Sequence, residues 1–202
     1  MPTFVWIIII VVVVVAACGA YLWSVNNALV TRDMKAKEAW SDVTVQLKRR
    51  ADLIPNLEEA VRGYTTHESE TLLALAQARA KVLAATGPAE AAEADGDLQT
   101  AVKGLSAVVE AYPALLANRN YLHLQDQLVD TEDKIQASRR LYNGVVRDLN
   151  TRIGVFPNSL FAKRLGFKPY EFFDAPSTRE DPDAPTISFA KSTTPDNPPE
   201  SV

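Results

Sequence analysis

Three charged residues occupy positions where the surrounding pattern predicts apolar side chains. Arg50 interrupts an apolar series that steps by four and three residues from Ala36 to Val61, and Glu132 and Arg139 interrupt a similar later series. Such series mark the buried seams of packed helices. A buried guanidinium and carboxylate can pair there and fix which helices meet, while contributing little net stability. We expect a structural polar layer of Arg50, Glu132 and Arg139. The alternative is a locally exposed seam from which these side chains reach solvent.

Residues that could bind metal or catalyse a reaction are few. Asp126, Asp130 and Asp133 share one face of a predicted helix and could hold a divalent cation, although a solvated acidic face is the simpler interpretation. Neither His67 nor His123 lies three residues after a glutamate, as a di-iron carboxylate site in a helical bundle requires. The sequence also lacks the common phosphate-binding, nucleophile-elbow and zinc-helix motifs. We therefore assign no catalytic, cofactor-binding or metal-ligating residue and expect a protein that is not an enzyme.

The composition limits the fold and the partners. The chain has 202 residues, of which 47% are hydrophobic and only 8% aromatic, a balance that favours helices with aliphatic seams. A formal net charge of -4 gives no basic field to attract nucleic acid, so we expect no nucleic-acid partner. The single cysteine, Cys18, excludes an intramolecular disulfide.

An uncharged segment, residues 4–23, lies near the N-terminus. At about 1.5 Å per residue, a helix of this length spans about 30 Å, the thickness of the hydrocarbon core of a bilayer. Trp6 lies near one end of the segment, and Tyr21 and Trp23 lie near the other, as in interfacial aromatic belts. We predict an uncleaved transmembrane anchor over residues 1–25 that contacts the lipid bilayer.

Two alternatives involve cleavage of this segment. A secretory signal would have a basic start and a shorter apolar stretch. A lipoprotein signal is suggested by the lipobox-like residues around Cys18, but it would also lack its basic start. The uncleaved anchor accounts better for both the length and the missing N-terminal charges.

The charges that flank the anchor predict its orientation. No Lys or Arg precedes the segment, whereas Arg32, Lys35 and Lys37 follow it closely. The positive-inside rule then places the N-terminus outside the cell membrane and the rest of the chain in the cytoplasm. These three cations could also contact anionic lipid headgroups, at about 1 kcal/mol each.

Residues 26–174 are predicted to form an antiparallel bundle of about four long helices. A polar joint at Asn26-Asn27 separates the anchor from the first helix, which continues with a kink through Pro55. Three further helices follow, the last a long one from Pro113 to Gly154, and the aromatic-rich stretch after it is predicted to cap one end of the bundle. Residues 175–202 hold six of the twelve prolines and are predicted to be a disordered acidic tail.

Several stretches of the chain resemble the LemA proteins, a family of bacterial membrane proteins. The most specific block runs from Glu38 to Leu57 and includes the run Gln46-Leu47-Lys48-Arg49-Arg50-Ala51-Asp52-Leu53-Ile54-Pro55-Asn56. Later blocks, in the expected order, are Val61–Tyr64, His67-Glu68, Glu110–Pro113, Leu124-Gln125 with Leu128, Glu132 to Asn143, Phe156-Pro157 and Gly166-Phe167. The resemblance implies a membrane-anchored helical bundle, and one branch of the family is associated with magnetosome membranes. It brings no catalytic residues with it.

Together these features favour a non-enzymatic scaffold. Long helices with apolar seams that project from a membrane suit association with another membrane or envelope protein, or with copies of the same chain. A lipid-binding protein that remodels membranes is the first alternative. A metal-binding or catalytic bundle is the second.

Overall fold

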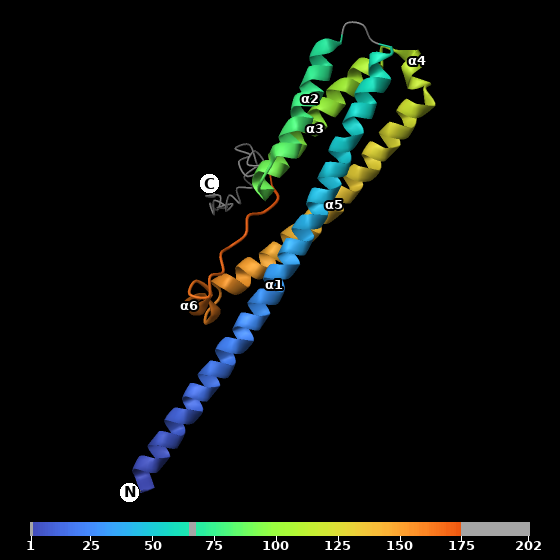
Figure 1. Ribbon diagram of the computed structural model, residues 1–202. Helices are drawn as coiled ribbons and strands as arrows, with labels where there is room; N and C mark the ends of the chain where they lie inside the picture. The colour runs from blue at the N-terminus through green and yellow to red at the C-terminus, as the bar shows by residue number, and fades with distance from the viewer. Residues whose placement is uncertain (1, 65–67, 175–202) are drawn as a thin grey trace, which may run out of the picture.

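The computed structural model describes residues 2–64 and 68–174 of the chain (Figure 1). The predicted disordered tail and His67 lie outside these residues. Regular structure in the described part consists of helices α1 (Pro2–Arg62), α2 (Ser69–Ala84), α3 (Pro88–Val109), α4 (Pro113–Leu116), α5 (Arg119–Gly154) and α6 (Asn158–Ala162), and no strand occurs there. The predicted all-α fold class is confirmed.

The first helix joins the apolar segment to the rest of the protein without a break. α1 is 61 residues long, and its N-terminal part is long and apolar enough to cross a membrane. The predicted joint at Asn26-Asn27 is therefore wrong, because the helix passes through it. Asparagine lowers helix propensity by only a few tenths of a kcal/mol, roughly, and packing begins at once, with Val25 and Leu29 both buried. The boundary that we expected near residue 25 falls inside a continuous helix.

α1 also continues through Pro55, and a neighbouring helix supplies what the proline removes. Proline has no backbone N–H, so in an α-helix the carbonyl of Ala51, four residues earlier, loses its usual donor. Ala51 is fully buried, which makes an unpaired carbonyl costly. The Arg79 side chain of α2 donates its Nε–H to this carbonyl oxygen at 2.9 Å.

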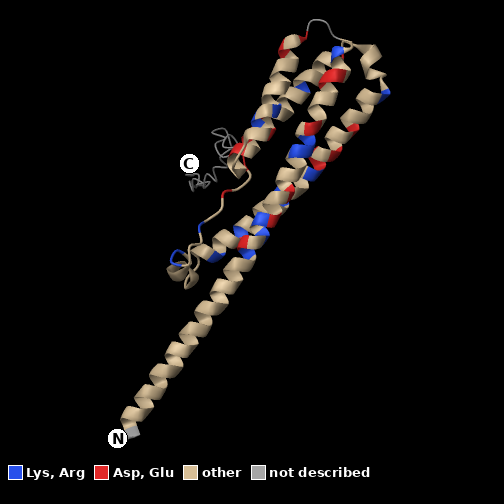
Figure 2. Cartoon of the chain, viewed as in Figure 1, with Lys and Arg blue, Asp and Glu red and all other residues tan. Residues whose placement is uncertain are grey.

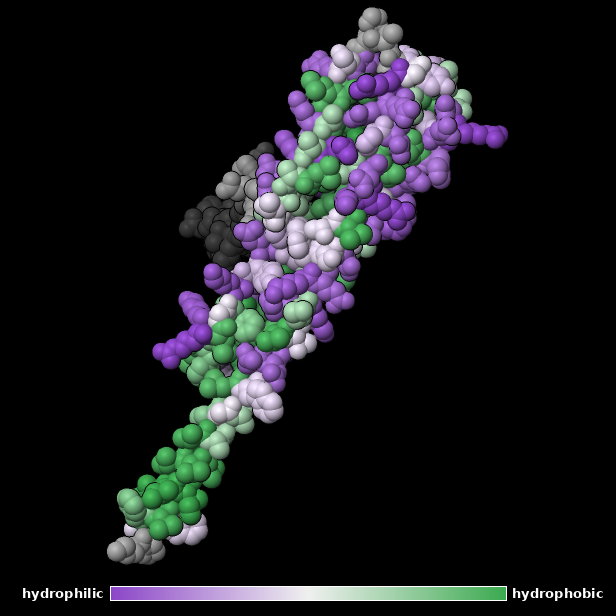
Figure 3. Space-filling view, viewed as in Figure 1, coloured by the Kyte–Doolittle hydropathy of each residue, from purple (hydrophilic) through white to green (hydrophobic). Residues whose placement is uncertain are grey.

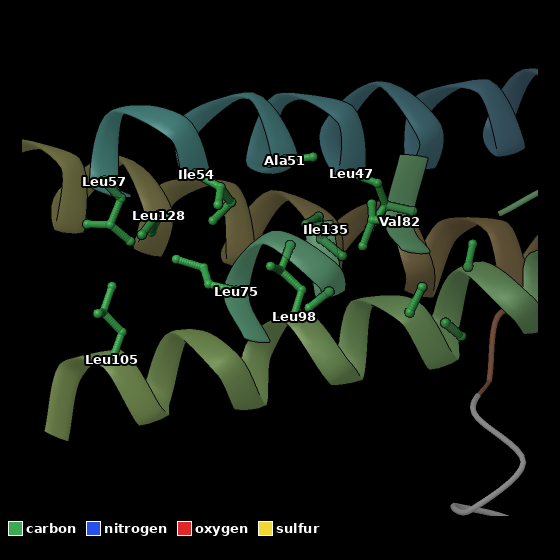
Figure 4. Packing of buried hydrophobic residues seen from close by; sticks show 14 of the residues in the cluster. Leu47, Ala51, Ile54, Leu57, Leu75, Val82, Leu98, Leu105, Leu128 and Ile135 are labelled. Atoms are coloured by element: carbon green, nitrogen blue, oxygen red, sulfur yellow. The ribbon is translucent and has the colours of Figure 1, made fainter. Parts of the chain in front are cut away.

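Four helices surround one interior. α1 and α5 run side by side in opposite directions over most of the body, and the α2–α3 hairpin lies against their distal part (Figure 1). Figure 4 shows that apolar side chains from all four helices point into the same space: Leu47, Ala51, Ile54, Leu57, Leu75, Val82, Leu98, Leu105, Leu128 and Ile135. The seams that were predicted from periodicity thus contribute most of this core.

The long helix that we predicted from Pro113 is divided in two. Pro113 begins α4, which ends after one turn, and α5 begins separately. Asn118 provides the start signal, because its side-chain Oδ1 accepts hydrogen bonds from the backbone N–H groups of Asn120 at 2.8 Å and Tyr121 at 3.3 Å. This is the usual role of asparagine at a helix N-cap.

The aromatic-rich C-terminal stretch begins at the basal end of α1 and α5 and then turns back along α5, so only its first part lies at one end of the bundle. After α5 the chain turns through α6, which lies beside the middle of α1 (Figure 1). Residues 152–168, from the end of α5 through α6 and the turn that follows, are called the basal segment below. Buried residues of α1, α5 and α6 form a small second core there: Val25, Leu29, Ala36, Leu149, Ile153 and Ala162. The following residues 169–174, the strap, run back along α5.

Candidate functional site

The most deeply buried charges form a cluster that joins three helices. Arg50 of α1 is only 4% exposed, and its Nη1 donates to Oδ1 of Asp95 in α3 at 3.0 Å and to Oε2 of Glu132 in α5 at 2.5 Å. Glu132 also accepts hydrogen bonds from Gln99 at 2.8 Å and Gln136 at 2.8 Å. The structure therefore brings together two members of the predicted polar layer, Arg50 and Glu132, and adds an aspartate that we did not predict.

Asp95 was missed because its surroundings look like a polar lead into a helix. The stretch after Pro88 is rich in Ala, Glu and Asp, yet it forms the first half of α3, with Ala91, Ala92 and Ala94 buried. Small alanine side chains let α3 approach its neighbours closely. The sequence did contain an indication of its burial. Asp95 lies three residues before Leu98, which is where the apolar repeat of α3 would place its preceding core-facing residue.

The third predicted member, Arg139, lies outside this cluster. Its Nη2 donates to Oδ1 of Asp174 in the strap at 3.0 Å, and its guanidinium lies 6.0 Å from the centre of the Phe173 ring. The predicted three-residue layer is therefore corrected to Arg50 with Glu132 and Asp95. Arg139 instead holds the end of the strap.

One guanidinium faces two carboxylates in this cluster, and the pKa of the Asp95 carboxyl differs from its usual value. Burial of Asp95 is the largest influence and raises the pKa of its carboxyl from 3.8 to about 6, while the nearby Arg50 lowers it and Glu132 raises it. Within the described residues, Arg50 Nε and Gln46 Oε1 are buried without a hydrogen-bond partner. Where two carboxylates share one cation, the more deeply buried carboxylate favours the protonated form.

The raised pKa predicts a specific pH dependence of stability. Because the folded-state pKa of Asp95 lies above the unfolded value, its contribution is fully present below about pH 4 and is lost as the pH rises through about 6. The variant Asp95→Asn cannot ionise, and its amide oxygen can still accept from Arg50. The free energy of unfolding of the variant, minus that of the wild type, should rise by roughly 1–3 kcal/mol between about pH 4 and pH 7. Denaturant titrations in detergent at the two pH values measure this difference, and a difference that stays constant or falls would contradict the assignment.

Two asparagines of α5 bind the strap as a pair of clamps. Asn150 accepts from the backbone N–H of Tyr170 and donates to its carbonyl, both at 2.9 Å. Asn143 makes the same two bonds with Phe173, at 2.9 and 3.1 Å. The asparagines lie seven residues apart, on one face of the helix, so they hold an extended chain parallel to its axis. These residues were not predicted, since an asparagine on a helix has no distinctive spacing.

A cavity of about 590 Å³ lies between α1 and the strap. Asp33, Lys37, Trp40, Tyr142 and Tyr170 are among its lining residues. Two of its charged groups are paired, since Asp33 binds Lys37 at 2.9 Å and accepts from the Tyr170 hydroxyl at 2.9 Å. Lys168 and Glu171 also line the cavity.

The acidic residues on α5 do not gather into a metal site. Asp130 forms an ion pair with Lys134 at 2.7 Å. Nowhere in the described ranges do three or more His, Cys, Asp or Glu side chains come together in a group that could hold a metal ion.

The three cations predicted to face lipid headgroups have different surroundings. Arg32 pairs with Asp148 of α5 at 2.6 Å, and Lys37 pairs with Asp33. Lys35 is exposed and forms no ion pair with any residue that the structure describes. Two of the three charges are thus partly satisfied within the protein.

Comparison with known proteins connects the chain to one family. The model of the LemA family matches residues 39–189. The protein LemA of Metamycoplasma hominis is 28% identical over 153 residues, which cover 74% of this chain and 68% of that protein. The magnetosome protein MamQ of Magnetospirillum gryphiswaldense is 36% identical over 80 residues, which cover 40% of this chain but only 29% of the relative. MamQ 2 of Paramagnetospirillum magneticum is 38% identical over a stretch of the same length, 80 residues, again 29% of that relative.

Proposed function

This chain belongs to the LemA family, and on that premise we propose that it is a membrane-anchored, non-enzymatic scaffold. In this proposal the apolar segment spans the cell membrane once. The antiparallel bundle then presents its helix faces to another membrane or envelope protein, or to copies of the same chain.

The observation that carries this proposal is the continuity of α1. The apolar segment and the first bundle helix are one helix, and core packing begins at Val25, two residues after the segment ends at Trp23. A bundle joined in this way cannot swing freely on a linker. Its distal end at Arg62 would stand about 55 Å from the bilayer, given the rise of a helix. A fixed height and orientation suit a protein that positions others.

We further propose that the bundle lies in the cytoplasm, as the positive-inside rule predicts from Arg32, Lys35 and Lys37. The fold adds support, because it brings the basic side chains of the basal segment to the same end of the apolar segment. A role in membrane remodelling through lipid binding is the second candidate. The basal segment is the feature that favours it.

The scaffold proposal predicts contacts at exposed apolar residues of the bundle. Val45 on α1 is 57% exposed and Val129 on α5 is 62% exposed, although both belong to helices whose other faces are buried. A photo-crosslinking amino acid at either position, in the full chain in native membranes, should give discrete adducts of higher mass that mass spectrometry can identify. The same probe at Leu57, which is 2% exposed, is the control and should react only within the chain.

Absence of adducts at both exposed positions, together with a strictly monomeric protein after mild detergent extraction, would contradict a scaffold. Adducts between two copies of the chain would identify self-association. Adducts with a second protein would identify the partner directly.

A further inference from the structure

We propose that the basal segment lies on the surface of the bilayer leaflet next to the end of the apolar segment and binds anionic lipid there. This inference rests on the proposed membrane anchor but not on the scaffold role. It assigns a ligand class to a surface formed by the end of α5, α6 and the turn that follows.

The height of the basal segment is set by direct contacts with α1. The Tyr21 hydroxyl, near the end of the apolar segment, donates to Oδ1 of Asn158 at the start of α6, at 3.1 Å. Val25 and Leu29, one to two turns farther along α1, are buried in a cluster with Ala162 of α6. If residues 4–23 span the hydrocarbon core, α6 must therefore lie at the level of the lipid headgroups (Figure 1).

The basal segment exposes an unusual amount of apolar surface at this level. Val155 is 53%, Leu160 60% and Leu165 42% exposed, and Phe156, at 75%, is the most exposed large apolar side chain that the structure describes. Figure 3 shows hydrophobic surface here, close to that of the apolar segment. Exposure of these apolar side chains to water is unfavourable. At the boundary between headgroups and acyl chains the same side chains would be buried.

The charge of the basal segment is entirely positive. The sequence contains no Asp or Glu between Asp148 and Glu171, whereas Arg152, Lys163, Arg164 and Lys168 lie within that interval. All four are exposed, and none forms an ion pair with another described residue, in contrast to Arg32 and Lys37. Figure 2 shows basic positions on the ribbon around α6. Each such cation near an anionic surface raises binding about fivefold.

Position, apolar exposure and charge together favour a lipid surface over a protein as the occupant. A protein partner would need an acidic and apolar groove placed at headgroup height. The bilayer offers both chemistries at that height along the whole perimeter of the helix.

The test measures how deeply the basal segment enters the bilayer. The full chain, with Cys18→Ser and Leu160→Cys, is labelled with a nitroxide and reconstituted in vesicles of phosphatidylcholine with or without phosphatidylglycerol. Collision rates with oxygen and with a water-soluble nickel chelate then report depth. We expect the label at residue 160 to be shielded from nickel in the vesicles that contain phosphatidylglycerol, and less so in phosphatidylcholine alone.

The triple substitution Lys163→Gln, Arg164→Gln and Lys168→Gln should weaken the attraction to anionic lipid about a hundredfold and abolish the additional shielding that phosphatidylglycerol gives the label. The matched control replaces three exposed cations at other positions in the bundle, Lys48→Gln, Arg49→Gln and Lys103→Gln, and should leave the label shielded. A label at residue 160 that is open to nickel in both kinds of vesicle would overturn the proposal. So would shielding that is unchanged by the three basal substitutions, because a protein contact would explain it better.

A second label separates failure of this inference from failure of the anchor. A nitroxide at Val13→Cys, in the middle of the apolar segment, should report the bilayer interior in every lipid mixture. If residue 13 is in the bilayer and residue 160 is in water, docking of the basal segment is wrong and the anchor stands. If residue 13 is also in water, the proposed membrane anchor itself is wrong.

Discussion

Replacement of Arg50 by methionine should lower the free energy of unfolding of the bundle by about 3–5 kcal/mol at neutral pH. The substitution preserves most of the aliphatic volume but removes the cation that forms ion pairs with both Asp95 and Glu132. Asp95 is 4% exposed, so its carboxyl group would remain buried without its ion-pair partner. Denaturant unfolding of the full chain in detergent, followed by far-UV circular dichroism, measures the loss.

The adjacent residue supplies the matched control. Arg49 is exposed, so Arg49→Met should change stability by no more than about 0.5 kcal/mol. Equal losses for the two substitutions would show that the buried cluster is not the cause. Combining Arg50→Met with Asp95→Leu and Glu132→Gln should recover most of the loss, because replacing a whole buried ionic group costs far less than breaking it. The cluster would then act mainly in selecting which helices meet.

Replacement of Phe173 by alanine should cost about 3–5 kcal/mol, as expected when a buried aromatic ring is removed. Phe173 is 2% exposed, and its ring centre lies 6.2 Å from that of Trp40 on α1. The Phe173 ring projects from the strap into the space between α1 and α5, and its loss would leave a cavity there. Unfolding measurements on the full chain test the magnitude.

The same substitution should loosen the strap before the bundle unfolds. The amide protons of Tyr170 and Phe173 are bonded to Asn150 and Asn143, so their hydrogen exchange should become faster in the variant than that of α5. Phe172 is only partly buried, and Phe172→Ala is the control, with a smaller expected effect on both measurements. If Phe172→Ala proved as damaging as Phe173→Ala, the anchoring role of the Phe173 ring would be wrong.

The candidate site could be predicted only in part. Arg50 and Glu132 were identifiable because each replaces an apolar residue in a regular series, and the structure brings them together. Arg139 satisfies the same criterion but binds Asp174 instead. A charge at a seam position shows that something unusual is buried there, but it does not identify the partner. Asp95 and Asp174 lie 45 and 35 residues from the arginines they bind.

The C-terminal stretch was also only partly predictable from the sequence. Its aromatic content correctly predicted burial of Phe173, but its course along α5 depends on hydrogen bonds from Asn143 and Asn150 to the backbone of the strap. A side chain can bond to the backbone of any residue type. No sequence pattern in the strap therefore reveals which of its residues these asparagines bind. The exposed charge of the basal segment also becomes evident only when α6 is placed beside Tyr21.

The sequence by itself determined the helices, the length of the apolar segment and most of the core-facing positions. Helix formation depends on hydrogen bonds between residues four apart and on an apolar repeat of the same local period, so both can be found within a short window. Tertiary structure alone decided the partner of each buried charge, the unbroken passage from the apolar segment into the bundle and the level of the basal segment. These depend on the approach of helices that are distant in the sequence, where several pairings satisfy the local pattern equally and only the packing of the whole bundle selects among them.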